Sequence, residues 1–126
     1  MIKPILSILI PSRGRFNDLI EAIDSFINTA TDKNSIEFVL KFDRDDHFSW
    51  NRINEIRQDV KTSVLITERL DGYKSLHTYA NYMIHQATGD WIMFSNDDIL
   101  MLTNGWDDIL RKEKKTLSCL DPYLLG

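Results

Sequence analysis

The chain has 126 residues, of which 43% are hydrophobic and 27% are charged. This length and composition fit one folded domain and exclude a disordered chain. The formal net charge of −4 at pH 7 excludes a diffuse basic surface for nucleic acid, and the single cysteine, Cys119, excludes an internal disulfide.

The amino-terminal stretch MIKPILSILIPS carries one early positive charge, and Pro4 and Ser7 interrupt its apolar run. Because no small-residue cleavage site follows, the stretch predicts a first β-strand rather than a signal peptide. No apolar run reaches the ~18 residues that a membrane span requires. We therefore expect a cytoplasmic protein without a transmembrane segment, and the sequence leaves peripheral membrane contact open.

The first two predicted elements are a strand and a helix. The run Ile5–Ile10, apolar except for Ser7, predicts a strand that Pro11 ends. Residues 17–30 place apolar side chains at i, i+3/i+4 and i+7, which predicts an amphipathic helix. Asn17 or Asp18 can cap its first turn.

A second strand and a second helix follow in the same order. Ile36–Phe42 is an apolar strand, and the acidic cluster DRDD comes directly after it. Residues 47–59 predict a helix whose inward side chains include Trp50, Ile53 and Ile56.

The rest of the chain repeats this alternation twice. Residues 63–67 and 90–95 predict strands, and residues 74–87 and 105–115 predict helices, the first of which Gly89 stops. The predicted buried stripe of the 74–87 helix consists of Leu76, Tyr79, Ala80, Met83, Ile84 and Ala87.

This alternating order of strands and helices predicts an α/β fold, with a mostly parallel sheet and helices on both faces. In such sheets, ligands bind beyond the carboxyl ends of the strands. Those ends carry the polar segments PSRGR, DRDD, TERLDGYK and SNDD. We therefore expect a binding site at that edge of the sheet.

Two adjacent carboxylates, Asp97 and Asp98, directly follow the last apolar strand. Such a pair loses hydration and suffers like-charge repulsion, and a hard divalent cation would relieve the repulsion. Mg²⁺ and Mn²⁺ prefer oxygen ligands, and carboxylates often hold Mg²⁺ together with substrate phosphates. The pattern indicates a metal site, and the alternative is a solvated loop in which one carboxylate caps the next turn.

Charged residues also follow the other strands. Asp43 comes directly after the second strand, where a carboxylate can accept a hydrogen bond from a base N–H. Arg13 and Arg15 follow the first strand, and they either contact phosphate or stabilise their loop. Arg69 and Lys74 follow the third strand and are candidate anion contacts, with unpartnered surface residues as the alternative.

In their order and spacing, these motifs resemble the nucleotide-binding half of family 2 glycosyltransferases, which have the GT-A fold. The resemblance rests on ILIPSRGRFNDLIEAIDSF, IEFVLKFD and YANYMIHQATGDWIMFSNDD, and on the GW that follows. It runs from about residue 5 to residue 110. It implies a GT-A-like, Rossmann-like sheet and a single nucleotide-sugar-binding domain over residues 1–126.

The resemblance also implies roles for individual residues. In that family the loop after the first strand contacts the nucleotide, an aspartate after the second strand binds the base, and a DxD-type motif after the fourth strand binds ribose and metal. The implied nucleotide-binding residues are Pro11, Ser12, Arg13, Asp43, Arg69, Lys74 and Asp97. The implied metal ligand is Asp98, and the implied cofactor is Mn²⁺ or Mg²⁺.

The sequence departs from the family in two places. Asn96 stands at the first position of the DxD-type motif, and no residue matches the general base that the acceptor-binding half supplies. We therefore expect the acceptor half to be absent and leave the catalytic residue unassigned, with Asp121 as the first residue to test and Asp107 and Asp108 next.

The hypothesis from the sequence is a glycosyltransferase, or its donor-binding domain. It would bind a nucleotide-diphosphate sugar, with a UDP-sugar favoured, and transfer the sugar with inversion to the hydroxyl of a glycan or another acceptor. The alternative is a catalytically silent module that binds a nucleotide-sugar.

Overall fold

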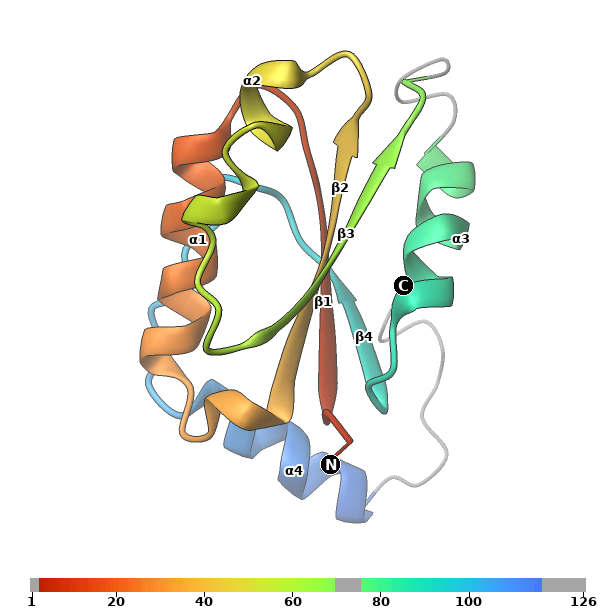
Figure 1. Ribbon diagram of the computed structural model, residues 1–126. Coiled ribbons are helices and arrows are strands. Elements are labelled where there is room, and N and C mark those ends of the chain that lie inside the picture. Colours follow the sequence, from red (N-terminus) through yellow and green to blue (C-terminus); the bar gives the residue numbers. More distant parts are fainter. Residues whose placement is uncertain (1–2, 70–75, 117–126) are drawn as a thin grey trace.

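The computed structural model describes residues 3–69 and 76–116. Within them, the chain forms an α/β fold around one sheet of strand order β3-β2-β1-β4 (Figure 1). The strands are β1 (Leu6–Ser12), β2 (Ile36–Asp43), β3 (Lys61–Thr67) and β4 (Trp91–Phe94). Every pairing in this sheet is parallel, which confirms the predicted fold class.

Helices cover both faces of the sheet, as predicted. Helix α1 lies on one face and α3 on the other, and α4 lies near the amino ends of β1 and β2 (Figure 1). The helices and helical turns are α1 (Phe16–Thr29), η1 (Lys33–Ser35), α2 (His47–Trp50), η2 (Ile53–Glu55), α3 (Leu76–Gln86) and α4 (Trp106–Thr116). Over residues 3–69 and 76–116, no helix combines the length and apolar character that crossing a bilayer requires.

The alternation of side chains along β2 divides them between the two faces. Phe38 and Phe42 belong to the main core beneath α1, whereas Val39 belongs to a smaller core beneath α3. The Phe42 ring stacks on Phe16, and Phe38 meets Phe26 edge-on, each pair with centroids 6.2 Å apart. Strand β2 is buried on both faces. Its face toward α1 is apolar, whereas the opposite face carries the buried charged residues Glu37, Lys41 and Asp43 beside Val39.

A buried carboxylate, Glu37, ties the start of β2 to the chain before β4. It accepts hydrogen bonds from the Ser7 hydroxyl at 2.7 Å and from the Thr88 amide at 2.6 Å, and the Lys61 ammonium lies 3.3 Å away. A Cβ added to Gly89 would lie 2.7 Å from the backbone nitrogen of Ser7, so this close approach requires glycine. Burial alone would raise the pKa of Glu37, but these contacts hold it below its ordinary value.

Strand β1 extends beyond its predicted end. Pro11 and Ser12 continue the pairing with Lys41 and Phe42 of β2. Strand β4 pairs with β1 only as far as Leu9, so among the described residues β1 has a neighbouring strand on one side alone at Pro11. Proline is tolerated at such edge-like positions, and the expectation that Pro11 ends the strand is wrong.

The predicted cap of α1 is also wrong. The helix begins at Phe16, and Arg15 is its N-cap residue without a side-chain hydrogen bond to the first turn. Asn17 and Asp18 therefore lie inside the first turn. Asp18 still favours the helix there, because a negative charge near the amino end complements the helix dipole.

The predicted helix over residues 47–59 forms only as the short turns α2 and η2. The Trp50 indole donates a hydrogen bond to the carbonyl oxygen of Arg44 at 3.0 Å. Ile56 is 3% exposed and still reaches the main core. Contacts of these side chains with the rest of the fold override the helical pattern, which is only a weak preference.

Helix α3 buries a narrower stripe than predicted. Tyr79 and Met83 are buried, but Ile84 is 39% exposed, so its predicted burial is wrong. Each residue turns a helix by about 100°, which carries Ile84 away from the sheet-facing direction of Met83. Lys74 and the side chain of Leu76 lie outside what the structure describes.

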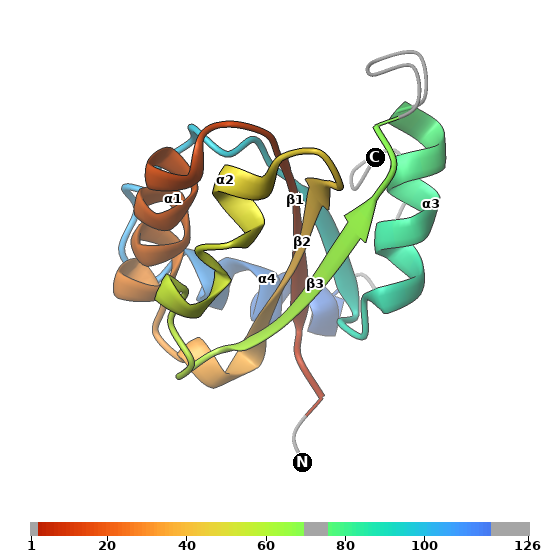
Figure 2. The same ribbon diagram turned by 45° about the horizontal axis from the view of Figure 1, so that its top comes forward.

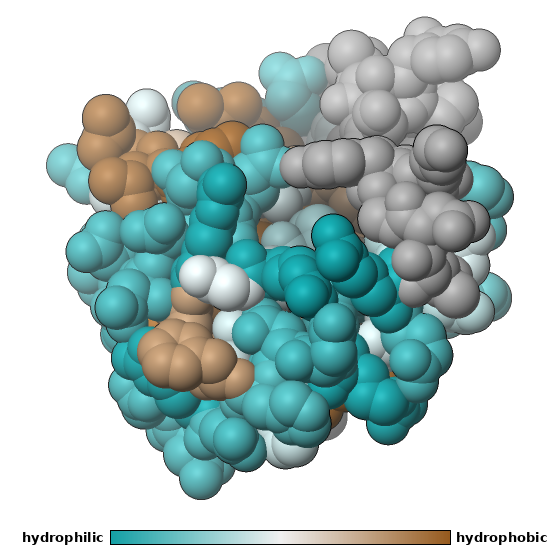
Figure 3. Space-filling view, turned by 90° about the horizontal axis from the view of Figure 1, so that it is seen from above, coloured by the Kyte–Doolittle hydropathy of each residue, from teal (hydrophilic) through white to brown (hydrophobic). Residues whose placement is uncertain are grey.

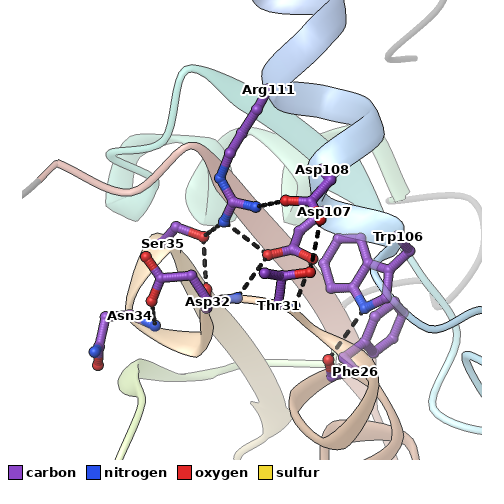
Figure 4. Close-up of polar contacts among 9 residues, drawn as sticks. All are labelled: Phe26, Thr31, Asp32, Asn34, Ser35, Trp106, Asp107, Asp108 and Arg111. Atoms are coloured by element: carbon purple, nitrogen blue, oxygen red, sulfur yellow. Dashed lines mark hydrogen bonds and ion pairs between the residues drawn. The ribbon is translucent and has the colours of Figure 1, made fainter.

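A second buried carboxylate fixes α4 to the end of α1 (Figure 4). Asp107 is fully buried, accepts hydrogen bonds from the backbone N–H groups of residues 31 and 32 at 2.7 and 3.0 Å, and pairs with Arg111 at 2.7 Å. The Trp106 indole donates to the carbonyl oxygen of Phe26 at 3.1 Å, and the two rings meet edge-on. The Asp107 carboxylate therefore has a structural role.

We predict that Asp107→Asn lowers the free energy of unfolding at pH 7 by about 3 kcal/mol, because it breaks a buried ion pair. Burial opposes ionisation, but the N–H groups of Thr31 and Asp32 and the Arg111 guanidinium hold the pKa of Asp107 below 3.8. Its stabilisation is thus present above pH 3.8 and is lost as the pH falls through the folded pKa. Denaturant unfolding should show a difference between parent and variant that shrinks on acidification.

Asp108→Asn is the matched control for this prediction. The Asp108 side chain is 49% exposed in its ion pair with Arg111, so we expect a loss below about 1 kcal/mol. Equal losses in the two variants would contradict the structural role of Asp107.

Candidate functional site

The segments that follow β1, β2 and β4 surround a cleft of about 510 Å³ at the carboxyl edge of the sheet. Figure 2 turns this edge toward the viewer. In the space-filling view of the same edge, hydrophilic side chains cover the middle and hydrophobic ones gather at one side (Figure 3). The cleft therefore lies where the topology of a parallel sheet predicts a ligand site.

The cleft brings together most of the residues that the sequence predicted for it. They are Pro11, Ser12 and Arg13 from the end of β1, Asp43 from the end of β2, Arg69 after β3, and Asp97 and Asp98 after β4. The remaining one, Lys74, lies outside the described residues.

The two adjacent carboxylates have different environments. Asp97 is 8% exposed and accepts a hydrogen bond from the Ser12 hydroxyl at 2.9 Å. The Asp98 side chain is 52% exposed. The Arg15 guanidinium lies between them, 3.7 Å from Oδ1 of Asp97 and 3.4 Å from Oδ2 of Asp98. An exposed cation thus partly neutralises this pair in the structure.

The contacts of the Asp97 carboxylate do not fully offset the effect of burial on its pKa. Burial raises its pKa above the ordinary value, and the neighbouring charge of Asp98 adds to this effect. The Ser12 hydroxyl and the Arg15 guanidinium act in the opposite direction but do not cancel it. A bound cation or hydrogen-bond donor would therefore gain from meeting this group.

Asp43 is buried and holds two basic partners. Its Oδ2 accepts a hydrogen bond from Arg13 at 2.9 Å, and its Oδ1 accepts one from Lys41. Arg13 also pairs with Asp45 at 2.5 Å. Its hydrogen bonds to Asp45 and Asp43 raise the pKa of Arg13. These ion pairs join the segment after β1 to the end of β2 and the loop that follows it, and a contact of Arg13 with phosphate stays a prediction.

Lys41 and Tyr79 are the cleft residues that sequence reasoning missed. Lys41 is 3% exposed, and its ammonium lies 3.7 Å from the centroid of the Tyr79 ring on α3. The sequence does carry a signal, because Lys41 is a lone cation in an apolar strand, two residues before Asp43. Residues two apart on a strand point to the same face.

The cleft differs in charge from the chain as a whole. Four basic side chains outnumber three carboxylates among the described residues that line it, whereas the chain has a net charge of −4. Guanidinium and ammonium groups bind phosphate oxygens through charged hydrogen bonds. The lining therefore suits an anionic ligand that also presents hydrogen-bond donors to the carboxylates.

The carboxylates of the cleft supply some of the ligands that a metal ion needs. Over residues 3–69 and 76–116, no three Asp, Glu, His or Cys side chains group closely enough to hold a metal ion by themselves. Asp97 and Asp98 nevertheless offer carboxylate oxygens at one place, next to the amide of Asn96. Mg²⁺ is commonly bound by one or two carboxylates and completes its coordination with water and substrate phosphates. The residues fit a cation that arrives with a phosphorylated ligand.

The residues named as candidate general bases do not meet in this cleft. Asp107 and Asp108 bind Thr31 and Arg111 near the amino ends of the strands (Figure 4). Their contacts are therefore those of a helix anchor. Asp121 lies outside the described residues.

Two solved structures of TarS from S. aureus, a GT-A-type glycosyltransferase, match this chain. The TM-scores are 0.66 for TarS 1-349 and 0.59 for the second TarS structure. The fold is glycosyltransferase-like. Sequence identity is 17% and 18%, over 90% and 87% of this chain. The chain spans 32% and 19% of the two TarS chains. No protein-family model and no curated protein sequence matches the chain.

We predict that Asp97→Asn raises the stability of the fold at pH 7 by about 1 kcal/mol, as changes at strained functional sites commonly do. The amide removes the buried charge and can still accept a hydrogen bond from Ser12. Because the pKa of Asp97 is raised, the parent loses stability as the pH rises from 3.8 through the folded pKa. Thermal unfolding should show an advantage of the variant that grows from acidic to neutral pH.

The matched control is Asp98→Asn, since that side chain is 52% exposed. We expect it to change stability by less than about 0.5 kcal/mol. An Asp97→Asn variant that is less stable than the parent at pH 7 would show that the carboxylate is well compensated after all.

Proposed function

We propose that this chain is the donor-binding domain of a glycosyltransferase and binds a nucleotide-diphosphate sugar, with a UDP-sugar favoured. The observation that carries the proposal is the meeting of Asp43, Asp97 and Asp98 with basic side chains in one cleft of a glycosyltransferase-like fold. In a complete enzyme, the sugar would pass with inversion to an acceptor hydroxyl of a glycan or another molecule.

The charged side chains of the cleft can each contact a chemically suitable part of such a donor. Asp43 is a buried carboxylate at one side, where it can accept a hydrogen bond from a base N–H. Asp97 can accept one from a ribose hydroxyl. The exposed guanidinium groups of Arg15 and Arg69 can bind the diphosphate.

Asp98, with Asp97 beside it, would hold the Mn²⁺ or Mg²⁺ of the donor. When bound, the cation would supply positive charge that offsets the charge of the diphosphate leaving group. Arg15 now contacts both carboxylates. Because its side chain is 57% exposed, it is free to turn from them toward a phosphate when the cation takes their charge.

A catalytically silent nucleotide-sugar-binding module is the second candidate. The observation in its favour is that Asp43, Asp97 and Asp98 are the three carboxylates that line the cleft within the described chain, and the donor contacts proposed above use all three. None is left over to deprotonate an acceptor. Turnover of a bound donor with an added acceptor distinguishes the two candidates.

A thermal-shift panel of nucleotides and nucleotide-sugars, with and without Mn²⁺, tests the proposal directly. A ligand that binds only the folded state raises its apparent stability with the logarithm of ligand excess. We expect UDP and UDP-sugars to stabilise the chain more than other nucleotides do. No stabilisation by any nucleotide would refute the proposed function.

We predict that Asp43→Asn weakens UDP binding by about 1–3 kcal/mol, because the base loses a hydrogen bond to a charged acceptor. Calorimetric titration of parent and variant measures this loss. Asp59→Asn is the control, since Asp59 lies outside the cleft and pairs with Lys33 and Arg57. An equal loss for all nucleotides would mean that Asp43 does not read the base.

We predict that Asp98→Ala removes the Mn²⁺-dependent part of UDP binding and leaves the fold intact, because this exposed carboxylate supports no core contact. Calorimetry with Mn²⁺ should give a lower UDP affinity for the variant, and calorimetry with a chelator should give similar affinities for variant and parent. Equal affinities of variant and parent in Mn²⁺ would exclude Asp98 as a metal ligand.

A further inference from the structure

Lys41 is a buried cation in the floor of the cleft. It extends from β2, it is 3% exposed, and its ammonium donates a hydrogen bond to Oδ1 of Asp43. The ring of Tyr79 faces the same ammonium at 3.7 Å. The lysine therefore has little freedom, with a carboxylate on one side and an aromatic face on another.

Core packing alone does not account for this lysine. A buried ion pair is often no more stable than two apolar side chains of similar size, because both charges lose their hydration. Val39, two residues earlier and on the same face of β2, is apolar and fully buried. A buried lysine at the next position on that face indicates a role at the site.

The two basic partners of Asp43 differ in how firmly they are held. Lys41 is enclosed and contacts Oδ1, whereas Arg13 contacts Oδ2 with a side chain that is 41% exposed and shared with Asp45. Arg13 can exchange this contact for water or a ligand, and Lys41 cannot. Oδ2 is thus the oxygen that can become available to a ligand while Oδ1 stays fixed.

We propose that Lys41 is a positioning residue for base recognition, which holds the Asp43 carboxylate in one orientation so that Oδ2 accepts the N–H of the base. This inference rests on the proposed function, because it assumes that Asp43 reads the base. Lys41 acts through Asp43 and has no contact of its own with the ligand.

The test is a double-mutant cycle with Lys41→Met, Asp43→Asn and the double variant, titrated with UDP and with ADP. We expect Lys41→Met to weaken UDP binding about tenfold, the effect of disturbing a hydrogen bond to a charged group. We also expect it to reduce the preference for UDP over ADP, which a purely structural defect would leave unchanged. In the Asp43→Asn background, Lys41→Met should change UDP affinity by less than about twofold.

Lys61→Met is the matched control. Lys61 opens β3 at the other end of the sheet, with a half-exposed side chain 3.3 Å from Glu37. The Lys61→Met variant should leave the affinity for UDP and the preference for UDP over ADP unchanged. If Lys41→Met alone does not fold, the double variant removes both charges together, and its UDP affinity relative to Asp43→Asn still tests whether Lys41 acts through Asp43.

Four results would overturn the inference, and the last of them would overturn the proposed function as well. Equal weakening of UDP and ADP by Lys41→Met would show a general role, and a further tenfold loss in the Asp43→Asn background would show direct contact with the ligand. UDP binding that needs Asp43 but not Lys41 would overturn the inference and leave the proposed function standing. A parent chain that binds no nucleotide would overturn both.

Discussion

The parallel pairing of β1 with β2 on one side and with β4 on the other is the constraint on which the site depends. It brings the carboxyl ends of three strands to one edge, although their last residues are far apart in the sequence. The hydrogen bond from the Ser12 hydroxyl to Asp97 joins the ends of β1 and β4 across the edge. Arg13 joins the end of β1 to the end of β2 through Asp43. The cleft therefore exists only when the sheet is assembled in this order.

The buried carboxylates of the fold serve different purposes. Glu37 and Asp107 are surrounded by N–H and hydroxyl donors and basic groups, and their pKa values lie below the ordinary range. Asp97 is also buried, but its pKa is raised. The first two hold elements of the structure together. Burial disfavours the charged form of the third, which is the pattern expected of a group whose partner comes from outside the chain.

The sequence predicted those parts of the structure that depend on local pattern. Strands β1 and β2 are rich in apolar residues because both are buried on both faces, and this signal needs no knowledge of the partner strands. The helix predicted over residues 47–59 forms only as α2 and η2, although Trp50, Ile53 and Ile56 still pack on the main core as the pattern predicted. The exposure of Ile84 also depends on how α3 meets the sheet, which periodicity does not determine.

The residues of the cleft also divide into those that local sequence pattern reveals and those that depend on packing. Asp43, Asp97 and Asp98 could be found because each closely follows an apolar strand that the sequence reveals. Lys41 was missed because it lies inside a strand, and its importance depends on the Tyr79 ring from a helix far along the chain. The ion pairs of Arg13 with Asp43 and Asp45 also depend on the three-dimensional approach of two loops, which no spacing in the sequence encodes.

The concentration of basic side chains at one edge of an acidic molecule has a consequence for how a ligand arrives. With a net charge of −4, the molecule as a whole repels a diffusing polyanion. The cleft opposes this repulsion locally, because four basic side chains face three carboxylates among the described residues that line it. Such an uneven field orients the ligand before contact and raises the productive fraction of encounters. Because dissolved salt screens this field over about 8–10 Å, association should slow as ionic strength rises, while contacts made deep in the cleft are screened much less.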